Sequence, residues 1–195
     1  MNLYVSIRYF IEPPIAILLG ILLLPVFMVV AVLIKLDSKG PIIFVQPRVG
    51  FKGRVFRMYK FRTMKQTQVD DAKFAADNDN RITRIGRFLR RTRIDELPQI
   101  WNIINLTMSF IGPRPEQIQF VEEFKKTIPN YMKRHEHKPG ITGLAQITSG
   151  YAYDDDTTKA KLSCDLDYIN RASLRLDLYI LIKTLGVIVN GFGAR

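Results

Sequence analysis

The sequence predicts an α+β protein that is predominantly helical, with an apolar N-terminal membrane segment and a small β-hairpin. Three observations predict this fold. Residues 15–34 are twenty consecutive positions without a charge. Residues 55–63 alternate between two faces, as a strand does, and from residue 83 apolar side chains recur at helical spacing. The length of 195 residues suits one domain together with a membrane element.

The composition excludes several classes of protein. With 47% hydrophobic and 24% charged residues, the chain is not disordered. Its single cysteine, Cys164, cannot form an internal disulfide, and two histidines, His135 and His137, are too few for a zinc site. The net charge is +11, and residues 48–93 hold 14 of the 29 basic residues. Such a charge favours anionic substrates or an anionic membrane surface.

The apolar segment has the length of a membrane span. Twenty helical residues extend about 30 Å, the thickness of the hydrocarbon layer. A single spanning helix is one interpretation. However, Pro25 lies near the midpoint and breaks or kinks a helix, so the segment could instead turn and leave on the face it entered. No cleavage site follows, and the basic residues from Lys35 onward favour a cytoplasmic location for the rest of the chain.

A β-hairpin is expected next. Residues 41–45 and 55–63 have strand-like patterns, and residues 50–53 form a turn cluster. Pro47 keeps its own position out of a central ladder. From Thr83 onward an amphipathic helix is expected, with apolar side chains on one face and arginines on the others; the apolar ones are Ile85, Phe88 and Leu89. This helix suits either anionic headgroups or solvent.

The adjacent acids Asp95 and Glu96 are the first candidates for chemistry. Pro98 is acceptable in the first turn of a helix, so Asp95 is expected as the N-cap, facing the positive helix end. With arginines nearby, this carboxylate is expected to be ionised. It could then act as a nucleophile or metal ligand, and a purely structural cap is the alternative.

The second candidate is Arg114, which lies between Pro113 and Pro115. The prolines restrict the backbone, so the arginine loses less freedom when its planar group binds two phosphate oxygens. The alternative is a surface turn with an incidental arginine. The turn-rich residues 138–143 could also approach a ligand through their backbone.

Six segments, taken in order, carry a family resemblance. They are Phe44-x-Gln46-x-Arg48-x-Gly50, Tyr59-Lys60-Phe61-Arg62-Thr63-Met64, Arg81-Ile82-Thr83-x-x-Gly86-x-x-Leu89-Arg90, Asp95-Glu96-Leu97-Pro98-Gln99-x-Trp101-Asn102, Met108-Ser109-x-x-Gly112-Pro113-Arg114-Pro115-Glu116 and Lys138-Pro139-Gly140-Ile141-Thr142-Gly143-x-Ala145-Gln146. Together they resemble the bacterial sugar transferase family, the monotopic phosphoglycosyl transferases, over nearly the whole chain.

The resemblance implies an activity and a location. It implies transfer of a sugar 1-phosphate from a UDP-sugar to undecaprenyl phosphate, with release of UMP, at the start of exopolysaccharide, O-antigen or capsule synthesis. It also implies a re-entrant membrane helix broken at Pro25 within residues 1–38, and a catalytic domain of residues 39–195 on the cytoplasmic face of the bacterial inner membrane. Amphipathic interfacial helices would surround the active site. Membrane lipids are implied as partners and nucleic acid is not; a homo-oligomer is left open.

The resemblance also implies roles for single residues. Asp95 would attack the sugar-bearing phosphorus and form a covalent aspartyl phosphosugar. Magnesium would bind Asp95 and Glu96, with Glu96 favoured as the dedicated ligand. Arg114 would bind substrate phosphate. Further phosphate- or substrate-binding residues are expected to be Lys60, Arg62, Arg90, Gln146 and Asp165.

Two other classes of function account for part of the pattern. A membrane-tethered nucleic-acid-binding module would explain the net charge of +11, but it does not require the acidic pair. A catalytically silent scaffold would keep the fold and the membrane segment without chemistry.

Overall fold

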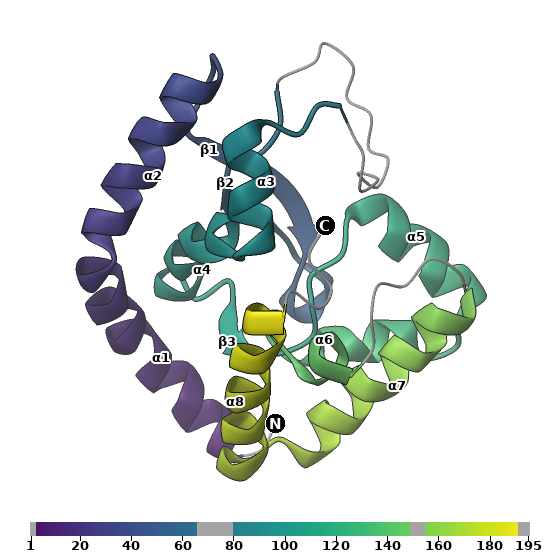
Figure 1. The fold of residues 1–195 in the computed structure, drawn as a ribbon. Coiled ribbons are helices and arrows are strands. Elements are labelled where there is room, and N and C mark those ends of the chain that lie inside the picture. The colour runs from purple at the N-terminus through teal and green to yellow at the C-terminus, as the bar shows by residue number, and fades with distance from the viewer. Residues whose placement is uncertain (1–2, 66–79, 149–154, 191–195) are drawn as a thin grey trace.

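The structure, a computed structural model, describes residues 3–65, 80–148 and 155–190. Figure 1 shows the two N-terminal helices as an arc along one side, the β1–β2 hairpin in the middle, and α5 and α7 on the opposite side. This confirms a predominantly helical α+β fold.

The elements are α1 (Leu3–Leu22), α2 (Leu24–Asp37), β1 (Ile43–Val49), β2 (Val55–Phe61), α3 (Arg84–Arg91), α4 (Ile100–Ile104), β3 (Ser109–Ile111), α5 (Ile118–Thr127), β4 (Gly140–Thr142), α6 (Leu144–Thr148), α7 (Asp155–Arg171) and α8 (Leu174–Asn190), with short 3₁₀ helices η1 (Phe51–Gly53), η2 (Ile94–Gln99) and η3 (Tyr131–Glu136).

The break predicted in the apolar segment is confirmed. Helix α1 ends at Leu22 and α2 begins at Leu24, so Pro25 lies in the first turn of the second helix. In that position the missing proline N–H removes no helical hydrogen bond. Helix α1 is also long and apolar enough to cross a membrane, with a mean hydropathy of 1.6.

Helix α1 is packed into the core of the protein. Val5 and Tyr9 lie in one apolar cluster with residues of β3, α7 and α8, and Ala16 lies in another with residues of β2 and α4. Two charged side chains of α1 are buried in the same interface. Arg8 lies 2.6 Å from the Asp177 carboxylate of α8, and Glu12 accepts a 2.7 Å hydrogen bond from the Ser109 hydroxyl. Because buried charges need partners, these contacts fix how α1 lies on the domain.

The end of α2 is tied to the same domain. Arg62 donates to the Ser38 carbonyl at 2.7 Å and to the Lys39 carbonyl at 2.9 Å. Asp37 accepts a hydrogen bond from the Ile85 amide at 3.0 Å. The α1–α2 pair is therefore held at its beginning by α8 and at its end by the hairpin and α3.

The predicted hairpin is confirmed. Strands β1 and β2 are antiparallel, in a register that runs from Ile43 opposite Phe61 to Val49 opposite Val55. Pro47 lies within β1, opposite Arg57, and a sheet of two strands tolerates it because both of its strands are edges.

Helix α3 is confirmed, and its predicted apolar face is buried only in part. Thr83 caps the helix by accepting a 2.9 Å hydrogen bond from the Gly86 amide, and Leu89 is fully buried. Phe88, which belongs to the predicted apolar face, is 54% exposed. In a helix of only eight residues the buried stripe is narrow, and Gly86 and Leu89 already fill it.

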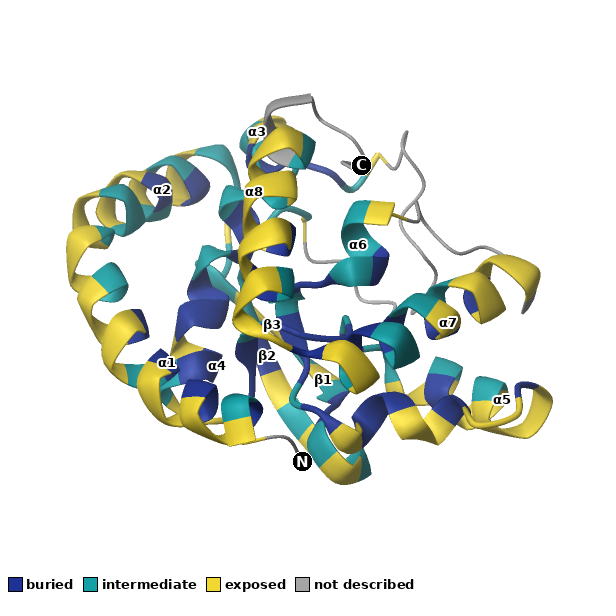
Figure 2. Cartoon of the chain, turned by 90° about the horizontal axis from the view of Figure 1, so that it is seen from below, coloured by how far each residue is buried: buried dark blue, intermediate teal, exposed yellow. Residues whose placement is uncertain are grey.

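Large apolar side chains cover much of the outer surface of α1, α2 and α8. Figure 2 shows exposed residues along the outer sides of these three helices. The residues are Leu3, Ile7, Phe10, Ile11, Ile15, Ile17, Leu18, Ile21 and Leu22 of α1, Leu24, Met28, Val29, Val32 and Leu36 of α2, and Leu174, Leu178, Tyr179, Leu181, Ile182 and Leu185 of α8. An apolar surface of this extent is unusual for a protein surrounded by water.

A short parallel sheet joins two of the turn-rich motifs. Strand β3 pairs with β4, with Ser109 opposite Gly140 and Ile111 opposite Thr142. The backbones approach so closely that a Cβ at Gly140 would lie 2.1 Å from the Gly112 nitrogen. The segment that contains Arg114 is therefore packed directly on residues 138–143.

Candidate active site

The two acids lie together in η2, but Asp95 is not the N-cap that the sequence predicts. The N-cap position belongs to Arg93, whose backbone is left-handed with φ 59°, and Asp95 lies inside the first turn. Because the left-handed residue Arg93 starts the 3₁₀ helix η2 at Ile94, the helical turn begins before Asp95 and continues through Pro98 to α4. Both acids are buried, with 8% exposure for Asp95 and 7% for Glu96.

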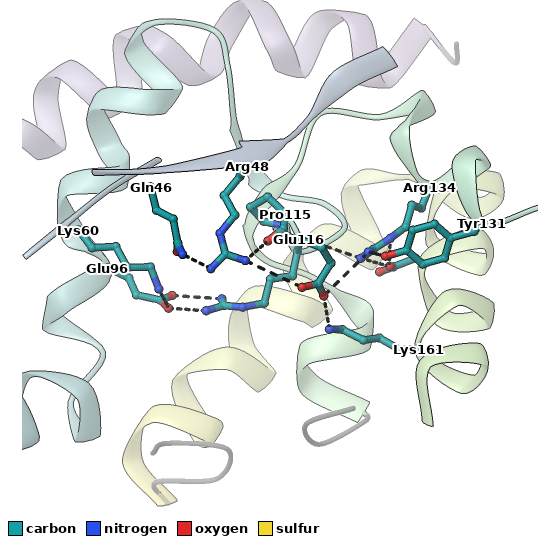
Figure 3. Close-up of polar contacts among 11 residues, drawn as sticks. Gln46, Arg48, Lys60, Glu96, Pro115, Glu116, Tyr131, Arg134 and Lys161 are labelled. Carbon is teal, nitrogen blue, oxygen red and sulfur yellow. Dashed lines mark hydrogen bonds and ion pairs between the residues drawn. The ribbon is translucent and has the colours of Figure 1, made fainter. Parts of the chain in front are cut away.

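Glu96 is bound by two cations from distant parts of the sequence. Its Oε1 lies 2.8 Å from Lys60 Nζ on β2 and 2.6 Å from Arg114 Nη2, and its Oε2 lies 3.4 Å from Arg114 Nη1. Figure 3 shows Lys60 directed at this carboxylate. Burial alone would raise the Glu96 pKa, but Arg114 and Lys60 outweigh burial and hold the pKa well below its ordinary value.

Asp95 behaves differently from its neighbour. Burial raises the Asp95 pKa to about 6, and the Glu96 charge acts in the same direction. Lys60, Arg114 and Arg90 lower it only in part. The site therefore contains one strongly ionised carboxylate beside one that is more basic than usual, which is the arrangement found where two acids have separate roles.

Asn102 fixes the acids relative to the hairpin. It is buried in α4, its Oδ1 accepts from the Tyr59 amide at 3.1 Å, and its Nδ2 donates to the Arg57 carbonyl at 2.7 Å. These two bonds hold α4, and with it η2, at a set distance from β2 and Lys60. Asn102 is part of the segment Asp95–Asn102 that carries the family resemblance, but the sequence predicts no role for it. Its position as a polar residue among the apolar residues of α4 could have indicated a buried hydrogen-bonding role.

A second cluster supports Arg114 from behind. Arg134 donates to the Arg114 carbonyl at 3.0 Å and lies 2.6 Å from the Asp165 carboxylate. Asp165 therefore holds Arg134 in place, and Arg134 in turn binds the backbone carbonyl of Arg114. Its expected part in substrate binding is not supported by this contact and stays a prediction.

Of the remaining residues predicted to bind substrate, Arg90 lies near the acidic pair, whereas Gln146 and Arg62 make contacts elsewhere. Arg90 lies near enough to Asp95 to lower its pKa, and Arg90 Nη1 is buried without a hydrogen-bond partner in the described residues. Gln146 donates to the Ile141 carbonyl at 2.8 Å, next to β4. Arg62 holds the end of α2 and makes none of the contacts that join Lys60, Glu96 and Arg114. For Arg62 and Gln146, a substrate contact stays a prediction.

The acids fit one mode of magnesium binding. Mg²⁺ uses one or two protein carboxylates and completes its shell with water and substrate phosphates. Asp95 and Glu96 are adjacent, and the contact that Glu96 Oε2 accepts from Arg114 Nη1 is long, at 3.4 Å. Within residues 3–65, 80–148 and 155–190 there is no cluster of three or more His, Cys, Asp or Glu that could hold a metal ion without a substrate.

The sequence of this chain is similar to those of several known proteins. The model of the bacterial sugar transferase family matches residues 4–191. A UDP-N-acetylgalactosamine-undecaprenyl-phosphate N-acetylgalactosaminephosphotransferase of Aeromonas hydrophila is 49% identical over 191 residues, which cover 95% of this chain and 45% of that protein. A UDP-glucose:undecaprenyl-phosphate glucose-1-phosphate transferase of Escherichia coli is 41% identical, over 87% of this chain and 37% of that protein.

A relative of similar length is also known. An exopolysaccharide production protein of Rhizobium leguminosarum is 40% identical over 85% of this chain and 86% of its own length. The chain spans less than half the length of the Aeromonas and Escherichia proteins. Since the family model covers almost every residue, including both acids and Arg114, the chain belongs to the bacterial sugar transferase family.

Proposed function

We propose that this protein transfers a sugar 1-phosphate from a UDP-sugar to undecaprenyl phosphate, releases UMP, and so starts synthesis of a surface glycan such as an exopolysaccharide, O-antigen or capsule. The observation that carries the proposal is the row Lys60–Glu96–Arg114 beside the buried Asp95. Two cations next to a basic carboxylate suit the displacement of one phosphate by another. The functions of the Aeromonas and Escherichia relatives support the substrate classes.

Asp95 is the nucleophile in this proposal. With a pKa of about 6 it is ionised at neutral pH, and it is more basic than an ordinary aspartate. Its oxygen bonds to the sugar-bearing phosphorus, and the bond from that phosphorus to the bridging oxygen breaks, so that UMP leaves with the electron pair. An oxygen of undecaprenyl phosphate then bonds to the same phosphorus. The bond to Asp95 breaks and the carboxylate is restored.

The neighbouring side chains bind and orient the phosphates. Arg114 and Lys60 would move part of their bonding from Glu96 to phosphate oxygens, and Arg90 lies on the Asp95 side of the site. Asp95 and Glu96 would also hold Mg²⁺, which when bound neutralises phosphate charge.

The same proposal assigns the protein to the cytoplasmic membrane. The apolar outer surface of α1, α2 and α8 suits lipid, and the basic segment suits the anionic inner leaflet. Because both ends of the α1–α2 pair are tied to one domain, the pair would enter and leave on the cytoplasmic side.

The test separates the two halves of the reaction. Purified protein with magnesium and a panel of UDP-sugars, but no undecaprenyl phosphate, should release UMP in an amount comparable to the enzyme and then stop. The retained phosphosugar should map to Asp95 by mass spectrometry. Asp95→Asn should abolish this burst, whereas Asp167→Asn, which changes a half-exposed acid on α7 paired with Arg171, should not. UMP release only after undecaprenyl phosphate is added, with no labelled protein, would exclude the covalent route.

A further inference from the structure

Arg48 on β1 lies between Gln46 and the segment Pro115–Glu116, which directly follows Arg114 in the chain (Figure 3). Its Nη2 donates to Gln46 Oε1 at 2.7 Å, and its Nη1 donates to the Pro115 carbonyl at 3.3 Å. Both partners are neutral acceptors that orient the guanidinium without removing its charge. The nearest carboxylate oxygen, Glu116 Oε2, lies 4.0 Å away.

The charge of Arg48 is only loosely neutralised. Glu116 is shared, since its Oε1 lies 2.7 Å from Lys161 Nζ and 3.9 Å from Arg134 Nη1. Arg48 Nε is buried and has no hydrogen-bond partner within the part of the chain that the structure describes. Burial and the nearby Arg114 cation lower the Arg48 pKa to about 10. A guanidinium in this state gains strongly from an anionic ligand.

The position of Arg48 distinguishes between two kinds of phosphate. Helix α2 packs on α3, whereas β1 contacts α5, and Lys161 beside Glu116 belongs to α7. Figures 1 and 2 both show α5 and α7 on the side of the molecule opposite α2. Arg48 therefore lies toward the side away from the apolar helix pair, which favours a phosphate of the soluble nucleotide over that of a lipid.

We propose that Arg48, oriented by Gln46 and the Pro115 carbonyl, is a second phosphate-binding residue that binds the nucleoside-bearing phosphate of the UDP-sugar, the group that leaves as UMP. Arg114 binds the sugar-bearing phosphate next to Asp95. The inference rests on the proposed function and adds to it the residue that holds the leaving group. A diphosphate then spans the two arginines, of which Arg114 is paired with Glu96 and Arg48 lies 4.0 Å from the shared Glu116.

The experiment measures the affinity for UMP and, separately, the KM of each of the two substrates. The full chain and its Arg48→Gln variant are titrated calorimetrically with UMP, and KM is measured for the UDP-sugar and for undecaprenyl phosphate. Arg48→Gln should weaken UMP binding and raise the donor KM by about 10- to 100-fold, the effect of losing a charge-assisted hydrogen-bonding group. The KM for undecaprenyl phosphate should stay unchanged. Arg54→Gln, at an exposed arginine of the same hairpin, should alter none of the three values.

The outcomes are distinct. If Arg48→Gln does not fold, judged by thermal unfolding, Arg48→Lys decides, since it keeps the charge but loses the planar group and should show the same split at smaller size. Unchanged UMP affinity and donor KM would overturn the inference, and a rise in the acceptor KM alone would assign Arg48 to the lipid phosphate instead. In both cases normal UMP release by the unmodified protein would leave the proposed function standing. Since UMP titration needs no turnover, an inactive protein that still binds UMP through Arg48 would contradict only the proposed function.

Discussion

Two neighbouring carboxylates in one short helix have pKa values shifted in opposite directions. Glu96 is ionised because Lys60 and Arg114 both contact it, whereas burial raises the Asp95 pKa to about 6. Above that pH the folded protein must hold Asp95 as a buried anion. The acid that we propose as the nucleophile is therefore one whose ionisation destabilises the fold, a common feature of active sites.

Asp95→Asn should accordingly stabilise the protein at alkaline pH. The folded-state pKa of Asp95 lies above its ordinary value of 3.8, so its ionisation opposes folding increasingly between these two pH values and fully above about pH 6. Asparagine cannot ionise, and the gain should be on the order of 1–3 kcal/mol at pH 8 and should fade toward pH 4. Thermal unfolding at both pH values measures it. Glu96→Gln is the contrasting control, because it leaves Lys60 and Arg114 without their shared anion and should destabilise. A gain for Asp95→Asn that is equal at pH 4 and pH 8 would refute the electrostatic cause.

Arg114 should not be replaceable by lysine. Its two guanidinium nitrogens contact the two oxygens of Glu96, and its backbone is held by Arg134. Arg114→Lys keeps the charge but loses the planar two-point contact, so we expect kcat/KM to fall by about 10-fold or more. Steady-state UMP release measures the loss. Near-normal turnover in Arg114→Lys would mean that charge alone is sufficient.

At the scale of elements, the short parallel sheet is what positions Arg114. The Gly112 amide donates to the Thr142 carbonyl at 2.9 Å, and the Gly140 amide donates to the Pro113 carbonyl at 3.0 Å. These bonds join the residues just before Arg114 to residues 140–142, so the two segments are held together. Close backbone contact, rather than a special turn, is the reason for glycine at position 140.

Gly140→Ala should therefore damage the site through the backbone. The added methyl group would meet the Gly112 nitrogen at 2.1 Å and the Thr142 carbonyl oxygen at 2.4 Å. We expect a loss of stability of about 1–3 kcal/mol or more and a larger loss of activity, since Arg114 would shift. Unfolding curves and UMP release measure the two effects. Gly186→Ala on α8, where a Cβ meets nothing within 4 Å, is the matched control and should leave both near normal.

Local features of the fold could be predicted from sequence, but long-range partners could not. The break at Pro25 and the hairpin follow from residues next to one another, and both are confirmed. Lys60 and Arg62 are two positions apart on one strand face, so pattern alone treats them alike. In the structure Lys60 contacts Glu96, while Arg62, just past the end of β2, contacts the end of α2. Sequence periodicity likewise does not predict that Asp165 pairs with Arg134 or that Arg48 lacks a close carboxylate. Both depend on contacts between residues far apart in the sequence.

At the scale of the whole molecule, the arrangement of α1 and α2 supports the proposed return of this segment to the cytoplasmic side. Arg8 is joined to Asp177 of α8, and Ser38 is joined to Arg62 at the end of β2. A single helix that crossed the bilayer would separate these two attachments by the membrane thickness of about 30 Å. A segment that returns to its starting face, as we propose, is compatible with both contacts to one domain.

Labelling of single cysteines should reveal this topology. In a background where the only cysteine, Cys164, is replaced by alanine, Leu3→Cys and Lys39→Cys should both resist a membrane-impermeant maleimide in intact cells and react after the cells are opened. Pro25→Leu removes a break that would cost a continuous helix about 3 kcal/mol, so a fraction of Leu3→Cys should then become labelled from outside. Adding Arg8→Leu, which removes the contact with Asp177, should increase that fraction. External labelling of Leu3→Cys without either change would show that the segment spans the membrane.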